Sequence, residues 1–199
     1  MRRVAVGCEE NMGQSDVNAF WAELSACEHF VQIYENDNEF LNTLSEFIFG
    51  GLDAGDAAVV ITTPGHRAGL QQRLAARGID VAAARLDDRY IELDAEETLA
   101  RFMVNGWPDD ELFESVIQGI LRQARGLKRR KVLAFGEMVA LLWANGHSGA
   151  TVRLEFLWQR LCEKKLFQLF CAYPKIGFTE DPAESIARVC QMHSKVLSA

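Results

Sequence analysis

Four predicted strands end in residues whose chemistry could serve a ligand or a substrate. These residues are Tyr34 and Glu35, Thr62 and Thr63, Gly136 and Glu137, and Cys171, Ala172 and Tyr173. Glu137 would project a carboxylate beyond a buried strand, where it could accept a hydrogen bond or shuttle a proton. It could equally cap or brace the helix that begins beside it. Parallel α/β sheets present their ligand crevice at the carboxyl ends of the strands, so these residues form the candidate site.

Cys171 and Tyr173 are two residues apart on a predicted strand, so their side chains point to the same face of the sheet. A thiol and a phenol in this arrangement could contact a small polar ligand. We favour a buried, inert thiol over a catalytic nucleophile, because no histidine neighbours Cys171 in the sequence.

Two predicted helices carry tryptophans that could line a ligand pocket. Glu155 and Trp158 lie one turn apart on one helix, where they could form a pocket wall. Packing in the core is the interpretation we favour for Trp158. Trp143, on the preceding helix, is open to the same two interpretations.

The histidines do not indicate a metal site. His29 begins a predicted strand, and His66 lies in the first turn of a helix that Thr63 can cap, so the two have no metal-ligand spacing. His193 lies on the predicted terminal helix and is interpreted as an ordinary helix residue. We therefore expect no bound metal.

Motifs that hold nucleotide cofactors are missing from the sequence. The first strand-to-helix turn, residues 34–39, has neither a glycine for curling around a phosphate nor a lysine to meet its charge. Neither G-x-x-x-x-G-K-[ST] nor G-x-G-x-x-G occurs anywhere, and G-x-S-x-G is also absent. We expect no cofactor and no nucleotide hydrolysis.

Charge and hydropathy exclude two classes of partner. The formal net charge of −7 opposes a broad attraction to phosphate backbones, so no direct contact with nucleic acid is expected. The longest apolar run, Met138 to Ala144, is far below the roughly 18 residues that span a bilayer. No association with a membrane is expected either.

The cysteines and the N-terminus indicate a cytoplasmic protein. Five cysteines without a C-x-x-C pair fit neither a disulfide framework nor a zinc ribbon, so they are interpreted as reduced thiols. Glu9 and Glu10 interrupt the apolar stretch that a signal peptide would need.

Alternating strand and helix patterns predict a three-layer α/β domain with a mainly parallel sheet. Strands are predicted at 29–35, 57–62, 89–93, 131–135 and 166–173. Helices are predicted to begin near Asn36, Thr63, Asp94, Asp109, Met138 and Gly149, and the first of them to end at Gly50 and Gly51. A leader helix is expected at 15–27, and Asp181-Pro182-Ala183-Glu184 is expected to start a terminal helix that continues to 197.

Spaced motifs over about residues 28 to 175 carry a family resemblance. They are His29-Phe30-Val31-x-Ile33-Tyr34, Phe47-Ile48-x-x-Gly51-Leu52 with Gly55-Asp56, Val60-Ile61-x-Thr63 with His66, Gly136-Glu137-Met138 with Leu142-Trp143, Leu154-Glu155 with Trp158, and Cys171-Ala172-Tyr173-Pro174. In order and spacing they resemble the MEDS domain, the methanogen and methylotroph sensory domain named after the regulator DcmR.

The resemblance implies a RecA-like or KaiC-like core without a phosphate-binding loop, which serves as a sensor of small hydrocarbon derivatives. Family members commonly occur beside a histidine kinase or a DNA-binding output domain. This chain stops soon after the core, so a partner chain or the terminal helix would have to carry the signal.

Three segments are therefore expected: a leader helix at 1–27, the sensory domain at 28–175, and a C-terminal signalling or docking helix at 176–199. The leading hypothesis is a cytoplasmic, non-enzymatic sensor that binds a small organic molecule and signals through a histidine kinase or another regulatory protein. Its expected pocket consists of Tyr34, Thr63, His66, Glu137, Trp143 and Tyr173. Glu155, Trp158 and Cys171 complete the candidate ligand-binding set.

Two alternatives stay open. An enzyme could use Glu137 as general acid or base and Cys171 as nucleophile on a small carbonyl or halogenated compound. A pure interaction module could instead close the pocket and dock a partner on the apolar side of 186–197. A homodimer through the terminal helix is a further hypothesis about the partner.

Overall fold

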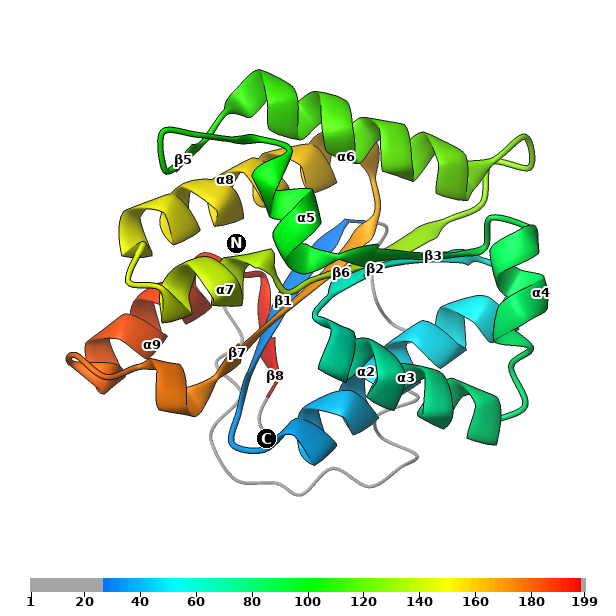
Figure 1. Cartoon of the computed structure of the whole chain (residues 1–199), viewed down its shortest axis with the longest axis horizontal. Helices are drawn as coiled ribbons and strands as arrows, with labels where there is room; N and C mark the ends of the chain where they lie inside the picture. The colour runs from blue at the N-terminus through cyan, green and yellow to red at the C-terminus, as the bar shows by residue number, and fades with distance from the viewer. Residues whose placement is uncertain (1–26, 198–199) are drawn as a thin grey trace.

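The computed structural model describes residues 27–197, which form a six-stranded parallel sheet between two layers of helices (Figure 1). The strand order across the sheet is β3-β2-β6-β7-β1-β8. The strands are β1 (Glu28–Tyr34), β2 (Ala57–Thr62), β3 (Tyr90–Asp94), β6 (Val132–Gly136), β7 (Gln168–Pro174) and β8 (Lys195–Leu197). This architecture confirms the three-layer α/β prediction. The predicted leader helix at 15–27 lies almost wholly outside the described residues.

Two groups of helices cover the two faces of the sheet. One face packs against α2 (Asp37–Asp53), α3 (Pro64–Ala76) and α4 (Val81–Leu86). The opposite face packs against α5 (Ala95–Ala100), α6 (Asp110–Arg125), α7 (Met138–Ala144), α8 (Ser148–Lys165) and α9 (Pro182–Gln191). A short hairpin of β4 (Met103–Val104) and β5 (Trp107–Pro108) precedes α6, and a 3-10 turn at Lys175–Gly177 follows β7.

The neighbouring inner strands β2 and β6 are almost entirely apolar, as expected for strands whose two faces are both covered by helices. Every residue of β2 and every residue of β6 is buried. Such strands lack the alternation of a half-exposed strand, as expected for a covered parallel sheet. Within residues 27–197, no helix combines the length and the apolar character that crossing a bilayer requires.

The predicted end of the first helix at Gly50 and Gly51 is wrong, because α2 continues to Asp53. Gly51 is a close approach rather than a stop: a Cβ added there would overlap the side chain of Leu133 on β6. The start of this helix is as predicted, since the Asn36 side chain accepts a hydrogen bond from the Glu39 amide at 2.9 Å.

The predicted terminal helix is too long. It ends at Gln191, and residues 195–197 form the edge strand β8, which pairs in parallel with Phe30–Gln32 of β1. This pairing satisfies backbone groups on the free edge of β1, and Ser194 strengthens it by donating its backbone N–H to the His29 carbonyl at 2.7 Å. The interpretation of His193 as a helix residue is therefore wrong, because His193 lies in the connection between α9 and β8.

Candidate functional site

Two clusters of polar side chains contain most of the predicted site residues. The edge cluster consists of Thr62, Thr63, His66 and Glu137, at the carboxyl ends of β2 and β6. The buried cluster consists of His29, Glu155, Cys171, Tyr173 and His193, on the face of the sheet that α8 covers.

Connections on opposite faces bring the edge cluster together. From β2 the chain runs through α3 to β3 on one side, and from β6 it runs through α7 and α8 to β7 on the other side. The neighbouring strands β2 and β6 thus form a topological switch point, where open α/β sheets leave a crevice for ligands. Glu137 follows β6 directly, and its backbone N–H donates to the Ile61 carbonyl of β2 at 2.9 Å.

The Glu137 carboxylate is the centre of the edge cluster and is buried. One oxygen accepts from the Thr62 hydroxyl at 2.7 Å and from the Thr63 backbone N–H at 2.8 Å. The other oxygen lies 2.6 Å from His66 Nδ1. This carboxylate therefore braces the start of α3, and it also holds an imidazole in a fixed orientation.

The two ionisable groups of this pair favour each other's charged form. The hydrogen bond with Glu137 outweighs partial burial and raises the pKa of His66 above its ordinary value. Burial alone would raise the pKa of Glu137, but its hydrogen bonds with His66, Thr62 and Thr63 bring it below the usual range. Each group of the pair therefore stabilises the charged form of the other.

His66 is the member of the edge cluster that faces outward. Its side chain is 16% exposed, and its Nε2 lies 3.5 Å from the carboxylate of Asp37, which is 71% exposed. Phe40 packs edge-on against the imidazole, with ring centroids 5.0 Å apart, and Tyr34 stacks on Phe40. Tyr34 thus supports the cluster from behind, and Nε2 of His66 is the atom that a ligand could reach.

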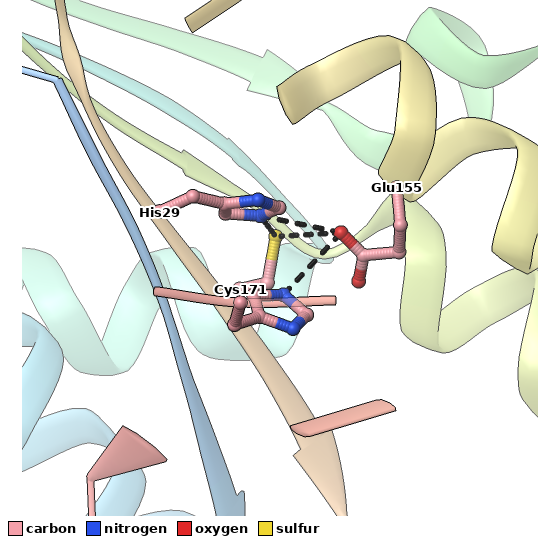
Figure 2. A group of neighbouring side chains, drawn as sticks. His29, Glu155 and Cys171 are labelled. Carbon is pink, nitrogen blue, oxygen red and sulfur yellow. Dashed lines mark hydrogen bonds and ion pairs between the residues drawn. The ribbon is translucent and has the colours of Figure 1, made fainter. Parts of the chain in front are cut away.

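Glu155 is the centre of the buried cluster. Its Oε2 lies 3.2 Å from His29 Nε2, and Figure 2 shows His29, Cys171 and Glu155 pointing toward one another. Its Oε1 accepts a short hydrogen bond from the Tyr173 hydroxyl. Burial would raise the pKa of Glu155, but the neighbouring charges and hydrogen bonds of His193 and His29 hold it well below its usual range.

The thiol of Cys171 lies beside a histidine that sequence proximity did not reveal. His29 Nε2 is 3.3 Å from Cys171 Sγ, although no histidine neighbours this cysteine in the sequence. The two residues are far apart in the chain and meet because β1 pairs in parallel with β7, with Val31 opposite Cys171. Burial, with the charge of Glu155, raises the pKa of Cys171 well above its ordinary value, which disfavours the nucleophilic thiolate.

The two tryptophans occupy different places on the same face of the sheet. Trp158 is fully buried in the core and packs edge-on against Phe113 at a centroid distance of 5.1 Å. Trp143 donates its indole N–H to the Gly177 carbonyl at 2.9 Å and lies edge-on to Tyr173. Trp143 therefore links α7 to the turn that leads to α9.

The six residues expected in one pocket are divided by the sheet. Tyr34 belongs to the apolar core under α2 and α3, whereas Tyr173 and Trp143 belong to the core on the other face. Tyr34, Thr63, His66 and Glu137 do lie together at the sheet edge. Surface hollows beside the β4–β5 hairpin and α6 are lined by other residues, among them Trp107 and Glu111.

Comparison with protein-family models identifies the family of this chain. The family described as MEDS, the methanogen/methylotroph DcmR sensory domain, matches residues 28–194. The chain belongs to the MEDS family. The match confirms the resemblance seen in the sequence, and it makes this a MEDS sensory domain with a role in signalling. It extends past the expected boundary at 175, so the MEDS domain includes α9 and His193. No curated protein sequence matches the chain.

Sequence reasoning missed three polar residues that the MEDS domain places at its clusters: Asp37, His29 and His193. His29 lies on the same face of its strand as Val31 and Ile33, which the alternating pattern indicates. Nothing in the sequence showed which strand would be the neighbour of this one. His193 was hidden by the helical pattern assigned to its segment. Only the pairing of distant strands reveals both contacts.

Proposed function

We propose that this MEDS domain senses a small organic molecule bound at the edge cluster. The observation that supports this proposal is the position of the His66–Glu137 pair at the switch point between β2 and β6. We assign the protein to the cytoplasm, where its cysteines would stay reduced.

Recognition would use Nε2 of His66 as a donor. Glu137 holds Nδ1 at 2.6 Å, whereas the contact of Nε2 with Asp37 is longer, at 3.5 Å, and more exposed. A ligand hydroxyl, carbonyl or carboxylate could replace Asp37 at Nε2, and the apolar part of the ligand would lie beside the ring of Phe40, which packs against His66. A short hydrocarbon derivative with one polar group has this chemistry.

A thermal-shift screen tests ligand binding, because a ligand specific to the native state raises the unfolding temperature by mass action. The probes are short alcohols, halomethanes and small carboxylates. We expect a saturable shift that Glu137→Gln and His66→Ala reduce and that Asp37→Asn increases, since Asp37 competes for the same nitrogen. His147→Ala, a change at an exposed histidine outside both clusters, is the matched control. No shift with any probe, or equal shifts in all variants, would refute the edge site.

The signal would leave the domain through α9. Glu137 precedes α7, and Trp143 at the other end of α7 holds the Gly177 carbonyl just before α9. Hydrogen exchange of the α9 amides should change on ligand binding in the wild type and not in Trp143→Phe. An unchanged α9 in the wild type would contradict this route.

The output would be received by a histidine kinase or another regulatory protein, or by a second copy of this chain. Most of α9 is exposed, and Val189 is its one buried residue. Charge reversal at Glu184 and Arg188 should therefore weaken a complex without unfolding the domain. Sedimentation velocity, with and without ligand, distinguishes a homodimer from a monomer that needs another partner.

The proposed role is non-enzymatic. An enzyme based on Cys171 would need an accessible thiolate, but this thiol is buried and its pKa is raised.

A further inference from the structure

The buried cluster, which is separate from the edge cluster, contains four side chains that could bind a metal ion. His29 Nε2, Glu155 Oε2, Cys171 Sγ and His193 Nε2 all lie within 4.8 Å of one another. They come from β1, α8, β7 and the connection between α9 and β8. Four different parts of the fold thus converge on one point.

Four of the six distances between these atoms are close to those of a tetrahedral metal site, and the other two are no longer than 4.8 Å. Bonds of about 2.0–2.3 Å at the tetrahedral angle place neighbouring donor atoms about 3.3–3.7 Å apart. His29 Nε2 lies 3.3 Å from Cys171 Sγ and 3.2 Å from Glu155 Oε2. Glu155 Oε2 lies 3.7 Å from Cys171 Sγ and 3.4 Å from His193 Nε2.

The tautomer of His29 presents a lone pair to this point. Gln159 donates its amide N–H to Glu163 at 2.8 Å, so its oxygen faces His29 Nδ1 at 3.1 Å. Nδ1 must therefore be the protonated nitrogen, and Nε2 of a neutral His29 carries a lone pair.

His193 is oriented in the same way. Its Nδ1 lies 2.8 Å from the Val189 carbonyl, which can only accept, so Nδ1 is the donor. Its Nε2 is buried and has no hydrogen-bond partner among the described residues. The side chains of both His193 and Glu155 are 0% exposed. His193 Nε2 also lies 3.4 Å from Glu155 Oε2, so a cation must sit between this buried nitrogen and the carboxylate, either a proton on the imidazole or a metal ion in its place.

Outer contacts hold all three of the oxygen and nitrogen ligands in place. Gln159 holds His29, the Val189 carbonyl holds His193, and the Tyr173 hydroxyl binds the second oxygen of Glu155. Metal-binding histidines and carboxylates characteristically have such partners, which fix their orientation.

We propose that His29, Glu155, Cys171 and His193 bind one Zn²⁺ ion in a closed tetrahedral site. Two imidazoles, a thiolate and a carboxylate suit this borderline-soft ion. On binding, the sulfur–zinc bond forms as the Cys171 thiol proton is released to water, the proton that His193 Nε2 holds towards Glu155 is released in the same way, and no electron is transferred. Because His193 precedes β8, the ion fastens the C-terminal segment to the sheet.

Metal analysis and cobalt spectroscopy of the full chain test the proposal. After dialysis against Zn²⁺ and removal of excess ion, we expect one zinc per chain. Replacement by Co²⁺ should give the intense visible bands of a tetrahedral site and a thiolate charge-transfer band. Absence of stoichiometric zinc, or of the thiolate band in the wild type, would overturn the proposal whatever the variants do.

Variants then assign the ligands. Cys171→Ser should abolish the thiolate band, and His193→Ala should weaken zinc affinity at least tenfold. Cys190→Ser and His147→Ala, which lie outside the cluster, should change neither. Circular dichroism verifies that each variant is folded. If Cys171→Ser does not fold, His193→Ala is the deciding variant, because His193 lies in the connection between α9 and β8 and not within a helix or strand. A folded His193→Ala with wild-type affinity, or a folded Cys171→Ser with the thiolate band intact, would refute the assignment.

Discussion

Glu137 and His66 lie 71 residues apart in the chain and meet at 2.6 Å, where they join the carboxyl ends of β6 and β2. The contact links α7 on one face of the sheet to α3 on the other. A substitution at either residue should therefore affect the packing of both helical layers.

Removal of the Glu137 carboxylate should destabilise the fold without abolishing it. Glu137→Ala leaves the Thr62 hydroxyl, the Thr63 amide and His66 without their acceptor. We expect a loss of about 2–3 kcal/mol in the free energy of unfolding, measured with urea. Glu180→Ala, at an exposed glutamate, should change it by less than about 0.5 kcal/mol. Equal effects of the two substitutions would contradict the bracing role.

The stabilisation by His66 should depend on pH. The pKa of His66 is raised above 6.5 in the folded state, so its contribution is fully present below 6.5 and is lost as pH rises through the folded pKa. The pKa of Glu137 is lowered below 4.5, so its contribution is present above 4.5 and is lost as pH falls through the folded pKa. The stability difference between wild type and His66→Gln should therefore shrink above pH 6.5. A difference that grows with alkalinity would show that His66 is not held in its charged form.

The two glycines of α2 should respond in opposite directions to alanine. Gly51→Ala would force a Cβ into Leu133 and should cost about 1–3 kcal/mol of stability. At Gly50 no atom lies within 4 Å of an added Cβ, so Gly50→Ala should stabilise the helix by about 0.5–1 kcal/mol. Urea unfolding of the two variants measures both changes in stability. Stabilisation by Gly51→Ala would refute the close contact with Leu133.

Cys171 should resist alkylation in the native protein. Its side chain is buried, whereas Cys190 is partly exposed. Peptide mass spectrometry after iodoacetamide treatment should find Cys190 modified well before Cys171, and both modified in denaturant. Native Cys171 reacting as fast as Cys190 would revive the enzyme hypothesis.

The parallel core was predictable because its signals are local. The run at 57–62 is apolar up to Thr62, as expected for a doubly covered strand, and Asn36 and Asp109 mark helix starts by chemistry within four residues of each cap. The position of Glu137 at the carboxyl ends of the strands was predictable for the same reason, since Glu137 follows a buried strand directly.

Contacts between distant segments were predictable only where both segments end at the carboxyl ends of the strands. The side-chain contact between His29 and Cys171 depends on the order of strands in the sheet, which local patterns do not encode. Residues 195–197 are too few to tell a strand from a helix end, and only the free edge of β1 decides between them. The Asn105-Gly106 turn of the β4–β5 hairpin, with both residues at positive φ, joins strands of two residues that leave no alternation to detect.

Nuclear magnetic resonance tests the central claim, that the edge cluster binds the sensed molecule. The Thr63 amide donates to Glu137 at 2.8 Å, so its resonance reports directly on this carboxylate. During titration with a compound that raises the unfolding temperature, the amides of Thr63, His66 and Glu137 should shift together and saturate at one affinity. Saturable shifts confined to the hollow around Trp107 and Glu111, with Thr63 unmoved, would contradict the account.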